Sequence, residues 1–147
     1  MKKFAFPLDR VLAWRRTQVR LEEAKLEQAH TQLRTLQQKI ENLAQERDSA
    51  RLQLFSSHGA TGAEFQALEP YRAASEAEGA RLTNSLEPAR QAITTQVQVV
   101  VERRRDVKLL ERLREKQVQV WTLAAAVELE QLAEDSYRAR SARSREP

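Results

Sequence analysis

The side chains that most often perform catalysis or bind metals are scarce in this sequence. It contains two histidines, His30 and His58, and no cysteine. A metal site or a general base would need further His, Cys, Asp or Glu residues at ligand spacing, and neither histidine has such neighbours, so both are interpreted as surface residues. With three glycines in the chain, a Gly-rich phosphate loop is not possible. The sequence therefore predicts no catalytic, metal or cofactor site, and a protein that is not an enzyme.

A basic stretch is the sharpest charge feature of the chain, whose net charge is +4 from 25 basic and 21 acidic residues. Its basic side chains are Arg103, Arg104, Arg105, Lys108 and Arg112. One interpretation is a contact with an acidic partner, and the other is a solvated helix face balanced by Glu102 and Asp106. Nucleic acid is disfavoured as a partner, because acidic residues interleaved in this stretch would repel phosphates.

The composition favours long helices over a wide core. Of the 147 residues, 41% are apolar, 5% are aromatic and 31% are charged, which is typical of coiled coils. Residues 8–57 contain no Pro or Gly, and apolar residues recur there at alternating steps of three and four: Leu26, Ala29, Leu33, Leu36, Ile40, Leu43, Ala50 and Leu54, with Arg47 in step. This heptad pattern predicts a helix over about residues 8–57 that packs against a partner helix. Arg15 and Glu22 intrude on its weaker N-terminal part.

A break follows this first helix. We expect a turn at residues 58–62, with Gly59 as the helix C-cap, and a second helix over about residues 63–137. Thr61 and Glu64 stand at the spacing of a capping box. Pro70 and Pro88 predict kinks or interruptions in the second helix, and residues 138–147 are expected to form a disordered tail.

The predicted fold is all-α, a single module over residues 1–147 built as a long antiparallel two-helix coiled coil. With the turn centred near residue 60, residue i faces about residue 120 − i, and helix 1 runs out opposite about residue 112. The remaining helix would overhang with Val118 and Trp121 uncovered, which favours a partner. The longest apolar run, residues 123–127, is too short to span a bilayer.

Two stretches carry a resemblance to a known family. The N-terminal segment Phe4-Ala5-Phe6-Pro7-Leu8-Asp9-Arg10-Val11-Leu12-Ala13-Trp14-Arg15 resembles the opening of flagellar FliJ proteins. The helix from Val101 to Lys116 is similar to the basic helix of that family. Phe65, Leu68 and Tyr71 resemble its aromatic-containing segment after the turn, although Pro70 departs from a straight helix there.

The resemblance implies a component of the flagellar type III export apparatus, with a fold similar to the central stalk of rotary ATPases. Its implied partners are the hexameric export ATPase, the cytoplasmic domain of the membrane export gate and the export chaperones. Phe65, Leu68 and Tyr71 are then the candidate gate-binding residues. The candidate ATPase-binding residues are Arg103, Arg104, Arg105, Lys108, Arg112, Val118 and Trp121. The implied location is the cytoplasm, peripheral to the inner membrane, with a role in motility and chemotaxis.

Three other functions stay open, the first of them as an alternative within the resemblance. An injectisome stalk protein belongs to a sister group that sequence separates poorly from the flagellar one. A structural coiled coil, or a basic coiled coil on nucleic acid, would have the same heptads without the export partners.

Overall fold

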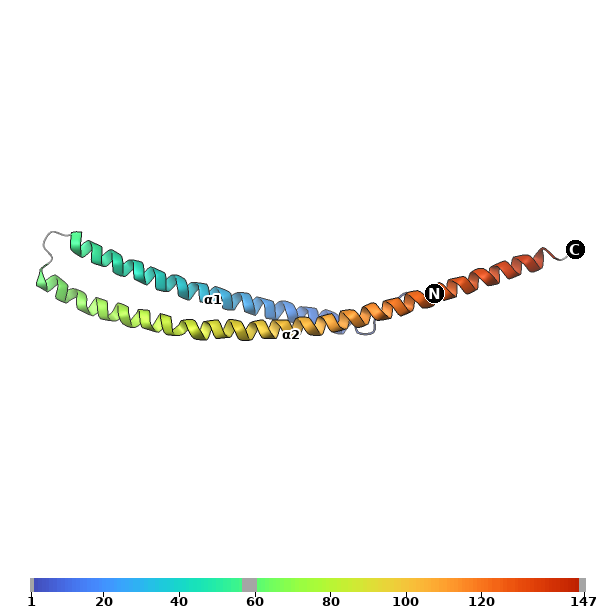
Figure 1. The fold of residues 1–147 in the computed structure, drawn as a ribbon, viewed down its shortest axis with the longest axis horizontal. Coiled ribbons are helices and arrows are strands. Elements are labelled where there is room, and N and C mark those ends of the chain that lie inside the picture. The colour runs from blue at the N-terminus through green and yellow to red at the C-terminus, as the bar shows by residue number, and fades with distance from the viewer. Residues whose placement is uncertain (1, 57–60, 146–147) are drawn as a thin grey trace. The chain divides into compact units, whose positions relative to one another are not determined.

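The structure, a computed structural model, describes residues 2–56 and 61–145, and in these residues it contains two helices and no strand. Helix α1 spans Asp9–Ser56 and helix α2 spans Gly62–Arg143 (Figure 1). The two helices pack against each other in antiparallel directions. The predicted all-α helical hairpin is confirmed. The expected turn at residues 58–62, including Gly59 as a C-cap, lies largely outside the described residues.

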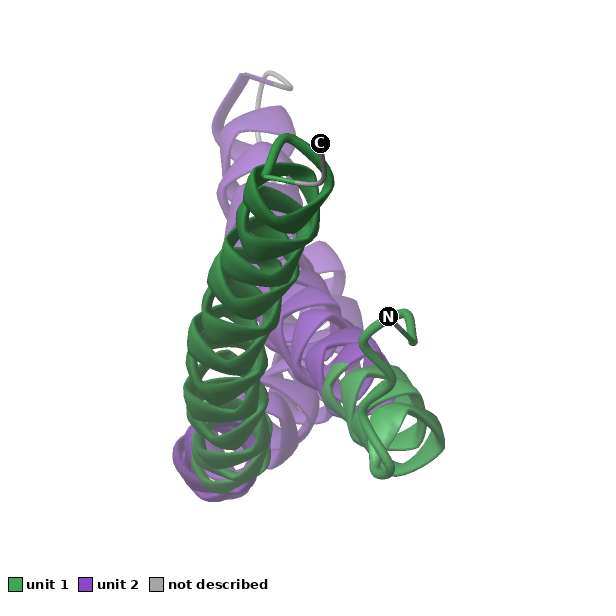
Figure 2. Cartoon of the chain, turned by 90° about the vertical axis from the view of Figure 1, so that its right-hand side faces the viewer, with its two compact units in different colours: residues 1–19, 102–147 green, residues 20–101 purple. Residues whose placement is uncertain are grey.

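The chain divides into two compact units (Figure 2). Unit 1 joins residues 1–19 to residues 102–147, and unit 2 comprises residues 20–101. In each unit a part of α1 packs against a part of α2. Both units are therefore held by contacts between segments far apart in the sequence.

The buried side of α1 is a narrow seam. From Leu12 to Leu54, the buried and half-buried residues recur at alternating steps of three and four. On α2 the same spacing runs from Ser75 to Leu110. We call these two rows the seam. Burial concentrates in a few members, such as Leu12 at 2% exposed, Val100 at 3% and Leu82 at 4%, so the fold depends on many small contacts along the seam instead of a wide core.

A buried carboxylate lies in the seam of unit 2. Glu22 is 9% exposed, and the side-chain amide of Gln96 donates to its carboxylate at 2.6 Å and to its backbone carbonyl at 3.0 Å. Lys25 donates to the same carboxylate at 3.1 Å. In the sequence Glu22 interrupts the apolar heptad pattern, whereas in the structure it accepts hydrogen bonds across the seam. Such a polar layer fixes how the two helices align.

A second polar layer of unit 2 contains Arg47. Its Nε donates to the hydroxyl of Ser75 at 2.6 Å, and its Nη2 donates to the Ser75 carbonyl. Gly79 permits this approach, because a Cβ there would lie 2.9 Å from Arg47 Nη2 and 3.6 Å from Leu43 Cδ2. Glycine has a low helix propensity, and its presence at position 79 is explained by the close packing of Arg47 against this part of α2.

Unit 1 has its own polar layer. Arg15 donates to Asp106 at 3.2 Å, and on one flank of the seam Arg16 donates to Glu111 at 3.0 Å. The predicted partners of residues 15, 22 and 47 were residues 105, 98 and 73, and the structure gives Asp106, Gln96 and Ser75. The alignment of the helices was therefore predicted to within about two residues.

Helix α2 is continuous through both prolines, so the interruption that the sequence allowed is absent. It runs through Pro70 and Pro88, and both prolines are exposed, so water can serve the carbonyls that each proline leaves unbonded. The helix also continues past residue 137 to Arg143, into the segment expected to be a disordered tail. Arg138 pairs with Glu134 one turn back at 3.6 Å, and arginines in the last turn suit the helix dipole.

The start of α2 has the predicted capping box. The backbone amide of Thr61 donates to the Glu64 carboxylate at 3.1 Å, and the Glu64 amide donates to the Thr61 hydroxyl at 3.4 Å. Each side chain thus satisfies a backbone donor that a helix start leaves unbonded.

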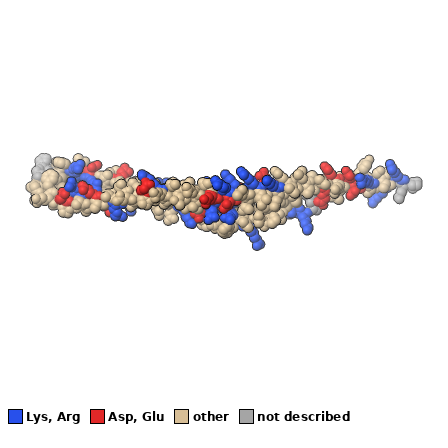
Figure 3. Space-filling model, turned by 60° about the horizontal axis from the view of Figure 1, so that its bottom comes forward, with Lys and Arg blue, Asp and Glu red and all other residues tan. Residues whose placement is uncertain are grey.

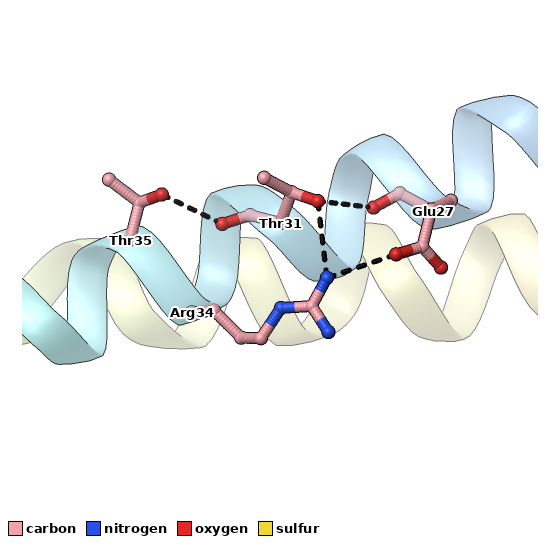
Figure 4. Close-up of polar contacts among 4 residues, drawn as sticks. All are labelled: Glu27, Thr31, Arg34 and Thr35. Carbon is pink, nitrogen blue, oxygen red and sulfur yellow. Dashed lines mark hydrogen bonds and ion pairs between the residues drawn. The ribbon is translucent and has the colours of Figure 1, made fainter.

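The outer face of α1 is polar and bonded to itself. Figure 4 shows Arg34 donating to Glu27 at 2.9 Å and to the Thr31 hydroxyl at 3.3 Å. Thr31 and Thr35 each donate to a carbonyl one turn back. Contacts this exposed contribute little stability, and this face serves below as a control surface.

Candidate partner-binding surfaces

The three candidate gate residues lie together in unit 2. With the end of α1 they line a groove of about 320 Å³. Phe65 is 49% exposed and Tyr71 is 43% exposed, while Leu68 is half-buried. Tyr71 is thus partly exposed, as a residue that meets a partner must be. We call this groove the tip groove.

The sequence missed one aromatic residue of the tip groove. Phe55, in the last turn of α1, lines the same groove and is 72% exposed. It directly follows the seam residue Leu54, so the heptad pattern places it outside the seam. The chain has only 4 Phe, so a Phe outside the seam and next to the turn could have been identified from the sequence as a candidate binding residue.

Charges of both signs border the tip groove. Arg47, Arg51 and Arg72 line it together with Glu69 and Glu76. The hydrogen bond from Arg72 to Glu69, together with the charges of Glu69 and Glu76, raises the pKa of the Arg72 guanidinium above its ordinary value. An aromatic floor with a mixed charged rim suits a protein segment better than a polyanion.

The structure divides the predicted ATPase-binding arginines between two environments. Arg103 is half-buried on the seam, whereas Arg104 and Arg105 are exposed. Lys108 and Arg112 are also exposed. Arg103 is therefore better placed to support the helix pair than to meet a partner.

Two acidic residues of the basic stretch face α1. Asp106 bonds Arg15 and Glu111 bonds Arg16. These pairs neutralise acids that would otherwise offset the basic stretch. On the face drawn in Figure 3, Lys and Arg side chains alternate with Asp and Glu along much of the surface. An excess of positive charge is therefore confined to short stretches of the chain.

The predicted uncovered surface at Val118 and Trp121 is partly covered by the N-terminal segment, residues 2–8. Trp121 donates from Nε1 to the Lys2 carbonyl at 3.3 Å, and its ring lies 6.1 Å from that of Phe4, centroid to centroid. The Arg114 guanidinium lies 5.7 Å from the Phe4 ring. Helix α1 begins at Asp9, which pairs with Arg114 at 3.5 Å, close to the predicted end opposite residue 112. The expectation that α2 is uncovered beyond this point is wrong as far as Trp121, because the N-terminal segment continues past the start of α1.

The apolar overhang begins after Trp121. Its exposed members are Leu123 at 68%, Val127 at 52%, Leu129 at 61%, Leu132 at 57% and Tyr137 at 74%. We call residues 122–143 the overhang. Exposed apolar side chains in this number are typical of a surface that a partner covers.

The described residues show no group of three or more His, Cys, Asp or Glu side chains that could hold a metal ion. Within the same residues, no helix is long and apolar enough to cross a membrane.

Comparison with known protein families decides the identity of the hairpin. The family described as flagellar FliJ protein matches residues 4–147. The chain belongs to the FliJ family. It is accordingly a component of flagellar type III protein export, and the FliJ family is a non-catalytic one. Neither the curated proteins nor the solved structures include a match to this chain.

Proposed function

We propose that this FliJ-family chain is a stalk-like adaptor that couples the hexameric export ATPase to the cytoplasmic domain of the membrane export gate, and that it also handles export chaperones. The observation that carries the proposal is the overhang, a helical segment whose large apolar residues are exposed, from Val127 at 52% to Tyr137 at 74%. The lumen of a ring offers a surface that can enclose such a segment. The family match, which is to flagellar proteins, favours the flagellar over the injectisome system.

The ATPase contact has an apolar part and a charged part. Leu123, Val127 and Leu132 of the overhang would be buried in the ring. Arg105 and Arg112 would meet acidic groups at its mouth. Charge attraction between separated partners mainly speeds encounter, whereas apolar burial mainly slows dissociation.

The gate contact is assigned to the tip groove. Phe65 and Tyr71 offer exposed rings in a groove, and buried aromatic side chains contribute strongly to protein interfaces. An apolar segment of the gate would fill the groove, and its charged flanks would meet Arg51 and Glu69. By this proposal the protein works in the cytoplasm, peripheral to the inner membrane.

The test is a binding titration with the purified cognate export ATPase at two salt concentrations. Arg105→Glu combined with Arg112→Glu should slow association and flatten its salt dependence. Val127→Gln combined with Leu132→Gln should accelerate dissociation. Thr35→Ala, on the outer face of α1, is the matched control and should change neither rate. Wild-type kinetics in both double variants would exclude the ring contact.

A parallel titration with the cytoplasmic domain of the gate tests the tip groove. Tyr71→Ala should weaken binding about tenfold or more, because truncating an aromatic interface anchor typically costs over 1.4 kcal/mol. Helicity should stay at the wild-type value. A large loss of helicity would mean that Tyr71 supports the fold instead.

A further inference from the structure

We propose that one flank of unit 1 is a docking groove for an acidic amphipathic helix of a partner protein. The groove is formed by Val11 and Trp14 of α1 with Leu109 and Leu113 of α2. It differs from the surface at Val118 and Trp121 but shares Arg112, and farther along α2 also Leu123 and Val127, with the proposed ATPase contact. The inference does not rest on the stalk function, because a soluble peptide tests it without the ATPase.

The first observation is a second heptad row on α2. Its members are Leu109, Leu113, Lys116, Val120, Leu123 and Val127, at steps alternating between four and three. The apolar members are 40–68% exposed, from Leu113 at 40% to Leu123 at 68%. We call this row the flank stripe. Such spacing over several turns is the pattern with which one helix packs against another, yet the flank stripe is distinct from the seam that α1 occupies.

The second observation is that α1 has matching residues on the same flank. Arg16 and Glu111 each follow a seam position, and their 3.0 Å ion pair marks one flank of the helix pair. In an antiparallel pair, residues that precede seam positions lie together on the other flank. Val11 precedes Leu12 and Leu109 precedes Leu110, so the two share that flank.

The α1 side of the groove is also apolar and exposed. Val11 is 41% exposed and Trp14 is 54% exposed. The Arg15 guanidinium lies 5.1 Å from the centroid of the Trp14 ring, so one face of Trp14 meets a cation. Apolar residues of both helices are thus exposed on this flank.

The third observation is the charge of the rim. Arg10 precedes Val11 on α1, and Arg112 precedes Leu113 on α2; both arginines are exposed. Arg112, Glu115 and Lys116 border a hollow of about 490 Å³ with Leu109 and Leu113. Asp106 on this flank is already paired with Arg15 at 3.2 Å. The rim is therefore net basic around an apolar floor.

This combination selects one kind of occupant. A second copy of the chain would bring two net basic rims together, which costs affinity. Nucleic acid would use the arginines but leave the apolar floor unused. A bilayer binds a broad apolar face on one helix, whereas this floor is a narrow heptad row interrupted by Lys116. A helix with leucines on one side and glutamates beside them would pack its leucines on the apolar floor and pair its glutamates with the basic rim.

The test uses the full chain and a labelled synthetic peptide of about three heptads, with Leu at the a and d positions and Glu at e and g. A matched peptide has Lys in place of Glu. Fluorescence anisotropy should show saturable binding of the Glu peptide and at least tenfold weaker binding of the Lys peptide. Arg112→Gln should weaken the Glu peptide and reduce its salt dependence.

Leu113→Gln tests the apolar floor and should weaken the Glu peptide about tenfold, or about 1.4 kcal/mol, because it removes apolar area that the peptide would bury. Leu52→Gln is the control, the same change at a residue of α1 that is 69% exposed and lies in unit 2, outside the surfaces assigned to partners, and it should leave affinity within about twofold of wild type. Circular dichroism monitors the fold, and Leu109→Gln replaces Leu113→Gln if helicity falls.

The inference is overturned if the Glu peptide does not bind, or binds no better than the Lys peptide. It is also overturned if Leu52→Gln weakens binding as much as Leu113→Gln does. A dimer in sedimentation that Leu113→Gln dissociates would make the occupant a second copy. Binding to phosphatidylserine vesicles without binding to the Glu peptide would make it a lipid surface.

Discussion

Replacing Gln96 by leucine should destabilise the hairpin, although leucine is the more apolar residue. The Gln96 amide donates two hydrogen bonds to Glu22, at 2.6 Å to the carboxylate and at 3.0 Å to the backbone carbonyl. A hydrogen bond to a charged group contributes about 1.5–3 kcal/mol, and one to a neutral group about 0.5–1.5 kcal/mol. The partial burial of the new leucine side chain would offset about 1 kcal/mol of the stability lost with these hydrogen bonds. The expected net loss is about 1–3 kcal/mol.

The paired substitution should behave differently. Replacing Glu22 and Gln96 together by leucine removes both polar groups and leaves an ordinary apolar layer. Replacing a buried polar or ionic layer by packed apolar residues is often neutral or stabilising. Lys25 also loses its part-buried ion pair with Glu22, but its own side chain is 62% exposed, so water can solvate the ammonium group. The double variant should therefore be at least as stable as the wild type.

Urea unfolding followed by circular dichroism measures both effects, with the denaturant slope checked for constancy. Gln98→Leu is the matched control, because Gln98 lies two residues along the same helix and is exposed; it should shift stability by less than about 0.5 kcal/mol. The reasoning is refuted if Gln96→Leu matches the wild type, or if the double variant is less stable than Gln96→Leu alone.

Three further predictions concern single contacts. Thr61→Ala should cost about 1 kcal/mol and speed hydrogen exchange in the first turn of α2, because the capping box is lost; unchanged exchange would argue against the cap. Phe4→Ala should shift the fluorescence of Trp121 to the red in a Trp14→Phe background, since the N-terminal segment would leave the indole; an unshifted spectrum would mean that Phe4 does not cover it. Gly79→Ala should push Arg47 away from its partner on α2, so its expected helix gain of about 1 kcal/mol should appear only in an Arg47→Leu background.

The heptad pattern was sufficient to predict the fold and nearly sufficient to predict how the helices align. Leu26, Leu33 and Ile40 repeat at a period that only a packed helix pair explains. Arg15, Glu22 and Arg47 looked like interruptions because their partners lie 91, 74 and 28 residues away. A single sequence does not reveal such pairings, which depend on the packed structure.

The surfaces were less predictable than the fold. The N-terminal segment lies outside any helix, and its few residues have no period, so nothing in the sequence showed that Phe4 would reach Trp121. Phe55 was missed for a similar reason, since its exposure depends on where α1 ends. The gate residues Phe65, Leu68 and Tyr71 were grouped by family resemblance, and their common groove appears only when α1 lies beside them.

The account depends most on the claim that the overhang enters the ring of the export ATPase. A photo-reactive amino acid placed at Val127, at Phe65 or at Thr35 of the full chain tests this directly in the presence of the assembled ATPase. The account predicts an efficient crosslink from Val127 and none from Thr35 or Phe65. Equal crosslinking from all three positions, or none from Val127, would contradict it.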